Sequence, residues 1–390
     1  SDVYKRQIYI MRILYVLKHN PWGIGGGCYA CRNYLQLFSE VFQGAEMDVC
    51  ICKEYLTPER KKEYPMAHFY PVAPRGFIGK VMTAFTGVMH RHQETVKALL
   101  KSNHYDYCVF DHNSIAGSLV RSCKNSGVKT IVLNHNCEYD YFKDNNGLLK
   151  RLLFLHQVKK NERKSYLNCD YNIFLTEEDK EQFAEMYGAS NTEAVVGGCF
   201  YPKNDHSLSE IKPFRKEHLK MVISGTMGNV QNMDGINYFL DELLPLVPKD
   251  IHIVLAGKNP PASLLERIKP MSPRVIIIPN PKDMDSIVQD CDIFLCPARL
   301  GGGMKLRVID GFRNGLPVLA HTVSARGYRN FEKSGMMWEF GTAEEFLKNL
   351  QLLIQDIKQE KITREMIMNE ACRMFAFGQA VERMKKTINK

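Results

Sequence analysis

A glycine-rich run with two basic residues is the part of the chain best suited to chemistry. Glycine lets the backbone approach a ligand closely, and free N–H groups at a helix start attract anions. Lys305 and Arg307 add two positive charges, and Asp310 is placed to accept hydrogen bonds from ribose hydroxyls. The pattern predicts a pyrophosphate cradle in which the glycines open a helix; a glycine-rich loop before a solvated basic helix is the alternative. The run is Gly301, Gly302, Gly303, Met304, Lys305, Leu306, Arg307, Val308, Ile309 and Asp310.

A histidine follows one of the apolar runs that we expect to be strands. His135 comes directly after Lys129–Asn134, and Glu138 lies three residues further on. Open parallel sheets bind ligands at the carboxyl ends of their strands, so a histidine at such an end is a candidate for a site. A packed or surface histidine is the alternative.

A second polar segment follows the run Tyr107–Phe110. It contains His112, which is a further candidate for contact with an acceptor. The residue types first favour capping of a helix by Asn113 or Ser114.

Three more glycines follow the first expected strand, where backbone N–H groups could meet a phosphate or an acceptor. They lack the G-x-G-x-x-G spacing of a dinucleotide site, and the second strand ends in Cys52-Lys53 instead of an acid, so we expect no nicotinamide enzyme. Cys28 and Cys31 form a C-x-x-C without a second pair or a histidine cluster, so we interpret them as helix residues and expect no metal site. The glycines are Gly25, Gly26 and Gly27.

From Met11 onward, short β-branched runs alternate with longer stretches whose apolar residues have three- and four-residue spacing. This alternation predicts a parallel sheet with helices on both faces. The expected strands are Arg12–Leu17, Asp48–Cys52, Tyr107–Phe110, Lys129–Asn134 and Tyr171–Leu175. The expected helices are Tyr29–Phe42, Gln93–Ser102, Ser114–Asn125 and Leu148–Leu167.

A second series of the same kind follows the polar stretch Pro202–His218, which we interpret as a linker. The expected strands are Lys220–Ser224, Ile251–Ala256, Val275–Pro279, Ile293–Cys296 and Pro317–Ala320. The expected helices are Asp234–Leu246, Ala262–Ile268, Met284–Gln289 and Lys305–Arg313.

Two Rossmann-like α/β domains are therefore expected, because 390 residues exceed what one hydrophobic core usually organises. Two such domains that face one another place a ligand cleft at the carboxyl ends of both sheets. The last segment, Arg364–Asn389, has the pattern of one amphipathic helix that packs back across the domain junction. The expected divisions are residues 11–205, 206–370 and 371–390, with residues 1–10 interpreted as foreign sequence before a natural start at Met11.

Composition is ordinary for a globular protein, with 45% apolar and 24% charged residues. No uninterrupted apolar run reaches the roughly 18 residues that a spanning helix requires. The cysteines are scattered through apolar strands and helices, which is typical of reduced thiols, so we expect a cytoplasmic protein.

The formal net charge of +9 is concentrated in one region of the chain. Between Lys53 and Lys101, nine Lys or Arg oppose four Glu, without the interleaved aromatic residues of single-strand binders, so nucleic acid is not expected as a partner. The apolar segment Gly76–His90 lies in this region. It is either a helix that covers the first sheet or a peripheral contact for the cytoplasmic face of the membrane or a lipid-linked acceptor.

The second half of the chain resembles the family 4 glycosyltransferases of the GT-B fold. The string GGGMKLRVIDGFRNGLPVLAH, which begins at Gly301, resembles the donor motif of a bacterial branch of that family, roughly G-[ST]-G-M-K-x-K-x-x-E-[AG]-x-x-x-G-x-P. The resemblance implies that Lys305 and Arg307 contact the donor diphosphate. Asp310 stands where the family has a ribose-binding Glu. Gly302 stands where the wider family has another Glu, so backbone N–H groups of the glycine loop must hold the transferred sugar.

Three further segments carry the same resemblance. Gly225 and Thr226 open a block that resembles G-S-x-x-x-x-x-N-x-D-G, whose first glycine approaches the β-phosphate. Pro279 stands where the family recognises the base through main-chain groups. His135 and Glu138 resemble the family's H-N-x-E, in which the histidine binds the transferred sugar and the glutamate supports the loop.

The resemblance also implies an activity. A retaining transferase of this type moves a sugar from a nucleotide-diphosphate donor, usually a UDP or GDP sugar, to a glycan or lipid-linked acceptor of the bacterial surface. It has no permanently bound cofactor. Lys305 and the loop amides would stabilise the leaving diphosphate without a metal, and no Asp-x-Asp motif lies at a strand end. A GT-B-fold sugar-nucleotide epimerase, with carboxylates lining the cleft, and a degenerate subunit that only binds or scaffolds are the alternatives.

Overall fold

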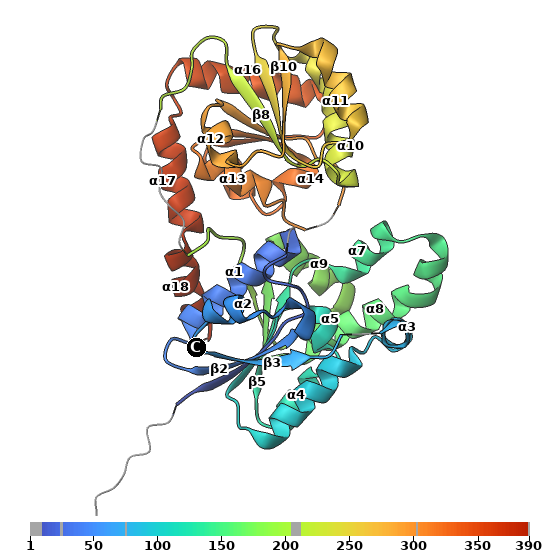
Figure 1. The fold of residues 1–390 in the computed structure, drawn as a ribbon. Helices are drawn as coiled ribbons and strands as arrows, with labels where there is room; N and C mark the ends of the chain where they lie inside the picture. The colour runs from blue at the N-terminus through green and yellow to red at the C-terminus, as the bar shows by residue number, and fades with distance from the viewer. Residues whose placement is uncertain (1–9, 24–25, 75, 204–211, 302, 389–390) are drawn as a thin grey trace, which may run out of the picture. The chain divides into compact units, whose positions relative to one another are not determined.

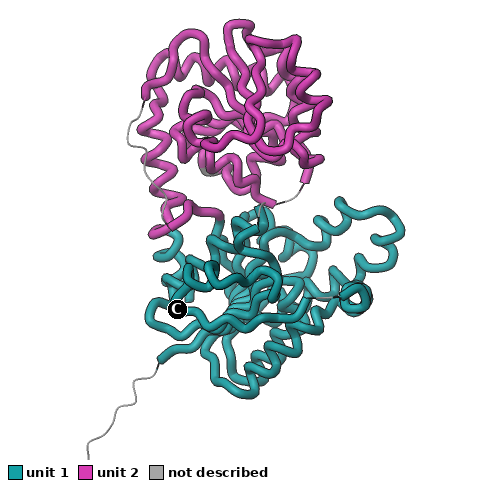
Figure 2. Tube along the Cα trace, in the orientation of Figure 1, with its two compact units in different colours: residues 1–198, 380–390 teal, residues 199–379 magenta. Residues whose placement is uncertain are grey.

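The computed structural model describes residues 10–23, 26–74, 76–203, 212–301 and 303–388. Gly25 and Gly302, two glycines of the predicted sites, lie outside the described residues, as does part of the expected linker. The chain divides into two compact units (Figure 2). Unit 1 comprises Ser1–Gly198 with Ala380–Lys390, and unit 2 comprises Cys199–Gln379.

Unit 1 contains seven strands that form one parallel sheet (Figure 1). They are β1 (Arg12–Val16), β2 (Glu46–Cys52), β3 (Ala67–Val72), β4 (Tyr107–Phe110), β5 (Lys129–Asn134), β6 (Tyr171–Phe174) and β7 (Glu193–Val196). Their order is β3-β2-β1-β4-β5-β6-β7, and in this register Leu14 of β1 lies opposite Asp48 on one side and Cys108 on the other.

Helices cover both faces of this sheet (Figure 1). On one face, Phe38 of α1 (Gly26–Val41) packs against Tyr15, with ring centroids 6.0 Å apart. On the other, Val96 of α4 (His90–Ser102) shares a buried cluster with Leu14 and Val16. Successive side chains of β1 thus point to opposite faces of the sheet and pack against different layers of helices. The other helices are α2 (Pro58–Lys62), α3 (Phe77–Thr86), α5 (Asn113–Ala116), α6 (Val120–Asn125), α7 (Glu138–Asn145), α8 (Leu148–Asn168) and α9 (Glu177–Tyr187), with a 3₁₀ turn at Lys53–Tyr55.

Unit 2 repeats the arrangement with a six-stranded parallel sheet (Figure 1). Its strands are β8 (Lys220–Thr226), β9 (His252–Lys258), β10 (Val275–Pro279), β11 (Ile293–Cys296), β12 (Val318–His321) and β13 (Met337–Phe340), in the order β10-β9-β8-β11-β12-β13. Met221 and Ile223 share a buried cluster with Leu350 of α16 (Ala343–Lys358), whereas Val222 shares another with Phe312 of α13 (Arg307–Arg313). Both sheets are therefore buried on both faces, as parallel sheets usually are.

The remaining helices of unit 2 are short, apart from the last one. They are α10 (Val230–Tyr238), α11 (Ala262–Ile268), α12 (Met284–Gln289), α14 (Thr322–Ala325), α15 (Arg329–Lys333) and α17 (Arg364–Phe375). The helix α18 (Phe377–Ile388) follows, and most of it belongs to unit 1. A π turn (Phe239–Leu243) and 3₁₀ turns (Leu244–Leu246, Lys269–Met271) complete the described helical segments.

The strand order of each sheet reverses beside the first strand of the unit, between β1 and β4 in unit 1 and between β8 and β11 in unit 2. Open α/β sheets bind ligands at the carboxyl ends of the strands at such a reversal. The predicted pair of Rossmann-like sheets is confirmed. His112 lies just beyond β4, and the glycine run lies just beyond β11.

Three strands were not expected from the sequence, and all three lie at the edge of a sheet. These are β3, β7 and β13. Edge strands are only half covered, so they have weaker apolar patterns, and β3 even contains Pro71, which an edge strand tolerates.

The expected helix Ser114–Asn125 is instead two helices, α5 and α6. Between them the backbone of Gly117 comes so close to α8 that a Cβ there would lie 2.4 Å from the main-chain oxygen of Asn161. This close approach of α8 interrupts the helix.

The expected helix Arg364–Asn389 is also two helices, because Ala376 between α17 and α18 has extended backbone with ψ 139°. From Ala380 onward, α18 belongs to unit 1, where the Tyr171 hydroxyl donates to the main-chain oxygen of Ile388 at 3.5 Å. The predicted return of the C-terminal helix to the N-terminal domain is confirmed.

The expectation that the segment Gly76–His90 forms a helix covering the first sheet is wrong. The helix in this segment, α3, buries none of its residues, and it contacts α8. Its apolar side chains therefore have another purpose than filling the core.

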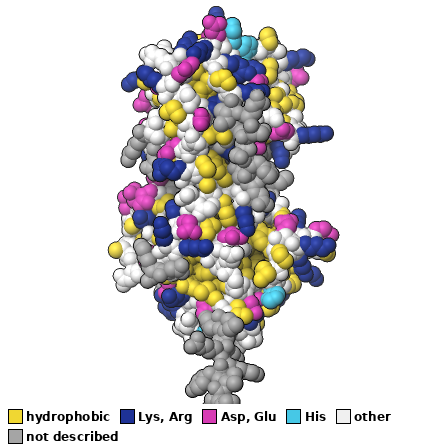
Figure 3. All heavy atoms as spheres, turned by 90° about the vertical axis from the view of Figure 1, so that its left-hand side faces the viewer, with side chains coloured by type: hydrophobic (Ala, Val, Ile, Leu, Met, Phe, Trp, Pro, Cys, Tyr) yellow, Lys and Arg dark blue, Asp and Glu magenta, His cyan; other side chains and the backbone are white. Residues whose placement is uncertain are grey.

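No helix in the described ranges is both long enough and apolar enough to cross a bilayer. On the face of the molecule shown in Figure 3, Lys and Arg side chains are intermingled with Asp and Glu. That face has no continuous basic area of the kind that nucleic-acid binding requires.

Candidate functional site

The glycine run of unit 2 forms a loop after β11. Gly301 and Gly303 have φ values of +87° and +72°, and a Cβ on Gly301 would lie 2.4 Å from the Gln231 amide, so this backbone path requires glycine. The expectation that the glycines open a helix is wrong, because α13 begins only at Arg307. Close backbone approach, and not a helix N-terminus, is what this loop offers a ligand.

Lys305 is the half-buried cation of this loop. Its ammonium group donates to the main-chain oxygen of Gly301 at 3.0 Å, and the Tyr328 hydroxyl donates to the main-chain oxygen of Lys305 at 3.1 Å. Burial, together with the positive charge of Arg326, lowers the pKa of Lys305 to about 8. Two cations held close together favour binding of an anion between or beside them, since an anion relieves their repulsion.

Arg307 and Asp310 pair with each other on α13. Arg307 Nη1 lies 2.8 Å from Asp310 Oδ2. Burial raises the pKa of the Asp310 carboxyl, and the ion pair with Arg307 works in the opposite direction. Arg307, which the resemblance assigns to the diphosphate, is thus paired with Asp310, which it assigns to the ribose. Met304 is partly buried and packs against the apolar cluster beneath the loop.

The end of β8 approaches β9 closely. Gly225 has φ +153°, and its main-chain oxygen lies 1.7 Å from the place where a Cβ on Gly257 would be. Asn232 of α10 donates from Nδ2 to the main-chain oxygen of Thr226 at 2.9 Å. The backbone of Gly225 and Thr226 is therefore fixed by its neighbours before any ligand binds.

Helix α10 ties this loop to the loop after β11. A Cβ on Gly235 would lie 2.9 Å from the backbone nitrogen of Ala298, and Arg299 Nε donates to Asp234 Oδ2 at 2.9 Å. The predicted donor residues at the end of β8 and those after β11 are thus brought together. Pro279 ends the edge strand β10, with β9 between it and β8, so it lies apart from this group.

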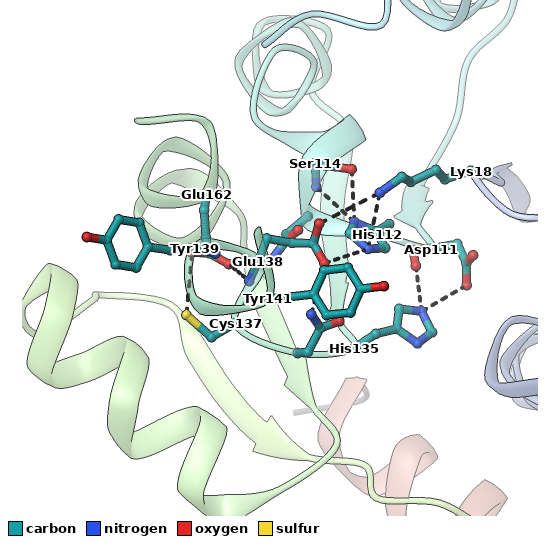
Figure 4. Close-up of polar contacts among 12 residues, drawn as sticks. Lys18, Asp111, His112, Ser114, His135, Cys137, Glu138, Tyr139, Tyr141 and Glu162 are labelled. Carbon is teal, nitrogen blue, oxygen red and sulfur yellow. Dashed lines mark hydrogen bonds and ion pairs between the residues drawn. The ribbon is translucent and has the colours of Figure 1, made fainter. Parts of the chain in front are cut away.

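In unit 1, a polar cluster is formed by the buried His112 and the partly buried Glu138 and Lys18 (Figure 4). His112 Nδ1 accepts a hydrogen bond from the backbone N–H of Ser114 at 3.2 Å, so His112 caps α5 and the expected capping by Asn113 or Ser114 is wrong. Because Nδ1 is an acceptor, the proton of the neutral ring is on Nε2, which lies 3.3 Å from Glu138 Oε1.

The surroundings of His112 and Glu138 determine which of the two is charged at neutral pH. Burial and the nearby Lys18 lower the pKa of His112 to about 4, so the ring is neutral at neutral pH. Burial opposes ionisation of Glu138, but His112, Lys18 and a hydrogen bond from Asn136 outweigh it and hold its pKa well below the usual range. Lys18 Nζ lies 3.8 Å from Glu138 Oε2. An ionised Glu138 therefore contacts a neutral imidazole and an ammonium group, and Lys18 Nζ also lies 3.4 Å from His112 Nε2.

His135 is buried beside this cluster, with its ring stacked 5.8 Å from that of His112. Its Nε2 lies 2.6 Å from the main-chain oxygen of Asp111, which can only accept, so the proton is on Nε2. Among the residues that the structure describes, no donor reaches His135 Nδ1. A buried acceptor without a donor is costly, and a ligand hydroxyl would satisfy it.

Glu162 of α8 holds the segment that carries Glu138. Its carboxylate accepts from the backbone N–H of Glu138 at 2.7 Å, from Asn113 Nδ2 at 3.0 Å and from the Tyr187 hydroxyl at 2.6 Å. Burial raises the pKa of Glu162 to about 7. The resemblance implies that Glu138 supports its own loop. Glu138 shares this role with Glu162, because Asn136 donates to Glu138 while Glu162 anchors the start of α7.

The glycines after β1 lie at the start of α1. Gly26 and Gly27 are its first two residues, and a Cβ on Gly27 would meet no described atom within 4 Å. Protein packing therefore does not require a glycine at Gly27.

Four functional candidates were missed in the sequence. Lys18 and His19 follow β1 at the strand reversal, where the strand-end argument used for His135 applies equally. Burial and the adjacent His112 lower the pKa of His19 to about 3. Arg326 and Glu162 have no such local signal, because only the fold brings them to their sites. No group of three His, Cys, Asp or Glu in the described ranges could hold a metal ion.

Both units are similar to known proteins. Residues 220–356 match the family model described as glycosyl transferases group 1. An "uncharacterized 44.6 kDa protein in cps region" of Klebsiella pneumoniae is 20% identical over 316 residues, which cover 75% of this chain and 78% of that protein.

Two solved structures are similar over almost the entire chain. Alr3699/HepE of Anabaena, in complex with UDP, superposes with a TM-score of 0.67 at 11% identity, covering 97% of this chain and 100% of that one. The lipopolysaccharide outer core galactosyltransferase WaaB, in its apo form, superposes with a TM-score of 0.66 at 13% identity, covering 97% and 99%. The chain therefore has the GT-B fold, and its residues 220–356 match the group 1 glycosyl transferases.

Proposed function

We propose that the protein is a retaining, metal-independent glycosyltransferase that moves a sugar from a nucleoside-diphosphate donor to a glycan or lipid-linked acceptor of a bacterial surface polysaccharide. UDP is the first donor nucleotide to test, since the similar HepE structure contains UDP. The similar WaaB acts on lipopolysaccharide, and the K. pneumoniae relative belongs to a cps region, which supports this acceptor class. We place the reaction in the cytoplasm.

The observation that carries the proposal is the cationic loop after β11. Lys305, half-buried and repelled by Arg326, lies beside Gly301 and Gly303, whose backbone can approach a ligand closely. A diphosphate leaving group gains negative charge as its bond to the sugar breaks, and fixed positive groups stabilise that charge. The loop belongs to the part of the chain that matches the group 1 glycosyl transferases.

His135 is the residue that we propose for the transferred sugar. Its Nδ1 is buried and accepts from no described donor, whereas Nε2 is committed to Asp111. A sugar hydroxyl that donates to Nδ1 would complete the hydrogen bonding of the ring. Glu138 and His112 fix the neighbouring acceptor surface, because each is already engaged by the other.

The proposed step is attack on the front face of the sugar. The acceptor oxygen forms a bond to the anomeric carbon while the bond from that carbon to the β-phosphate oxygen breaks. The acceptor proton passes to the departing phosphate, whose negative charge Lys305 stabilises. No carboxylate serves as a nucleophile in this scheme, so the anomeric configuration is kept without a covalent intermediate.

Nucleotide binding followed by donor hydrolysis tests the proposal. We expect UDP or GDP to raise the Tm, and Lys305→Ala to weaken that nucleotide about tenfold or more, since hydrogen bonds to charged groups contribute about 1.5–3 kcal/mol. Lys282→Ala, on the same unit, is the control. If no nucleoside diphosphate raises the Tm, the transferase proposal is wrong.

A second function is a subunit that binds a nucleotide sugar but does not turn it over. The observation in its favour is the pair between Arg307 and Asp310, which engages both side chains with each other. This alternative predicts nucleotide binding without release of sugar, in the presence or absence of acceptor. Transfer of labelled sugar to a glycan or lipid extract excludes it.

A further inference from the structure

Unit 1 has a large exposed apolar surface on two helices. The large hydrophobic side chains of α3 are between 39% and 82% exposed, and α3 buries no residue at all. The first two turns of α8 expose four leucines to between 50% and 74%. The residues of this two-helix surface are Phe77, Ile78, Val81, Met82, Phe85, Leu148, Leu149, Leu152 and Leu153.

The two helices are joined in one structure. α3 contacts α8, and the rings of Phe85 and Phe154 meet edge to face with centroids 5.1 Å apart (Figure 1). Gly87, which ends α3, lies over α8, and a Cβ there would be 3.6 Å from Asn161 Cβ. Monomeric soluble proteins rarely expose so large a group of neighbouring apolar side chains without a partner.

The charge around this surface is mainly positive. Residues 64–93 contain no Asp or Glu, and neither do residues 145–161. α8 carries six Lys or Arg and a single acid, Glu162, which is buried. Lys80, Lys150 and Lys160 are exposed. An apolar surface that is flanked mainly by exposed cations, with the exposed Asp144 of α7 just before α8, complements an anionic surface with an apolar interior.

We propose that the two-helix surface binds the face of a bilayer that contains anionic lipids. Phe and Leu side chains enter the acyl boundary while the Lys and Arg heads remain among the lipid phosphates. A second copy of the chain fits less well, because a symmetric contact would place the basic α8 of one copy against that of the other.

The two-helix surface is joined through α8 to the polar cluster of His112, Glu138 and Lys18. Leu152 and Glu162 lie on the same helix, ten residues or about 15 Å apart along its axis. Glu162 anchors the segment that begins with Glu138. A membrane-bound unit 1 thus holds its polar cluster close to the lipid headgroups, which favours a lipid-linked acceptor. Only this choice of acceptor rests on the proposed function.

Co-sedimentation with vesicles tests the surface. We expect the full chain to bind phosphatidylcholine vesicles that contain phosphatidylglycerol, and to bind vesicles of phosphatidylcholine alone much more weakly. Phe77→Glu with Leu152→Glu should lower the partition coefficient about tenfold or more, since each removes a large exposed apolar side chain that would enter the lipid. Lys150→Glu with Lys160→Glu should lower it in the anionic vesicles only.

The matched control is Met66→Glu with Leu352→Glu, two exposed apolar residues away from the two-helix surface. It should stay within about twofold of the unchanged chain, as surface substitutions usually do. Equal partition of the Phe77/Leu152 variant and the control overturns the proposal. So does light scattering that shows a dimer which the Phe77/Leu152 variant dissociates.

The same samples are also titrated with UDP and GDP. Vesicle binding without nucleotide binding leaves the surface intact and removes the proposed transferase function. Nucleotide binding without vesicle binding leaves the proposed transferase function intact and overturns the proposed membrane surface.

Discussion

The two units present their candidate residues in opposite ways. In unit 2, Lys305 lies on a loop in which Gly301 and Gly303 adopt positive φ, and it is held beside a like charge. In unit 1 the charged groups are partly buried and already paired, with Glu138 in contact with both His112 and Lys18. The loop can bind an anionic ligand, which relieves the repulsion between Lys305 and Arg326. The polar cluster can accept only a ligand that fits hydrogen bonds already in place.

This difference separates what each unit contributes. Substitutions in the unit 1 cluster should change folding and turnover and leave nucleotide affinity alone. Substitutions in the unit 2 loop should change nucleotide affinity and its pH dependence and leave folding alone.

The largest effect is expected for Glu162→Ala. It leaves the donors of Glu138, Asn113 and Tyr187 without an acceptor in a buried place, so we expect the free energy of unfolding to fall by about 3 kcal/mol. Urea unfolding followed by circular dichroism measures it. Glu185→Ala, an exposed glutamate of α9, is the control, and an equal loss in both variants would show that the buried network contributes nothing special.

The next effect is expected for His135→Ala. Loss of the proposed hydrogen bond to the transferred sugar should lower kcat about a hundredfold, as removal of one well-placed transition-state contact does elsewhere. The Kd for the nucleotide should not change, because His135 belongs to unit 1.

His92→Ala provides the matched control for His135→Ala. His92 is also buried in unit 1, where its Nε2 bonds the main-chain oxygen of Leu17 at 3.1 Å. It should affect stability and not kcat. A fall in kcat of similar size in both variants would mean that His135 acts only through folding.

Much of this comparison could be predicted from the sequence, because buried strands and strand ends have local signals. β4, β5 and β11 lie inside their sheets and have the predicted bounds, and their apolar runs are continuous since both faces of the sheet are covered. The edge strand β10 also has the predicted bounds, because its sequence VIIIP is a continuous apolar run. The edge strands β3, β7 and β13 were missed, because they are only partly covered and their apolar patterns are weaker.

The residues of the candidate sites also divide into those with a local signal in the sequence and those without one. Lys305 and His135 could be predicted because each stands beside a strand end, where chemistry is expected. The partners that set their behaviour could not. Arg326 lowers the pKa of Lys305 from 21 residues away along the chain, and Glu162 reaches Glu138 from the middle of a different helix. Only the fold makes these pairs neighbours.

The pH dependence of nucleotide affinity sharpens the comparison from the side of unit 2. The pKa of Lys305 is lowered to about 8, so in the free protein its ammonium group loses its proton as the pH rises through that value. A diphosphate stabilises the charged form, so binding above pH 8 takes up a proton and affinity falls with rising pH. Because one proton is taken up on binding, calorimetric titration with UDP should show up to about a tenfold loss of affinity for each pH unit above 8.

Lys305→Arg is the diagnostic variant for this dependence. A guanidinium group stays protonated throughout the range, so its affinity should be flat where that of the unchanged chain falls. The same fall in both proteins would assign the titration to a group other than Lys305.

The smallest effect is expected for Asp310→Ala, and its sign is informative. The substitution frees Arg307 for the diphosphate but removes the proposed ribose contact, and an exposed ion pair contributes only about 0–1 kcal/mol, so UDP affinity should change by less than about fivefold. If Asp310 binds ribose, the variant weakens UDP and leaves 2′,3′-dideoxy-UDP unaffected. If Asp310 serves only to hold Arg307, both nucleotides change together. The second result would leave the phosphate-binding loop intact but assign ribose recognition to the backbone, so that unit 2 would bind its donor almost wholly through main-chain groups and Lys305.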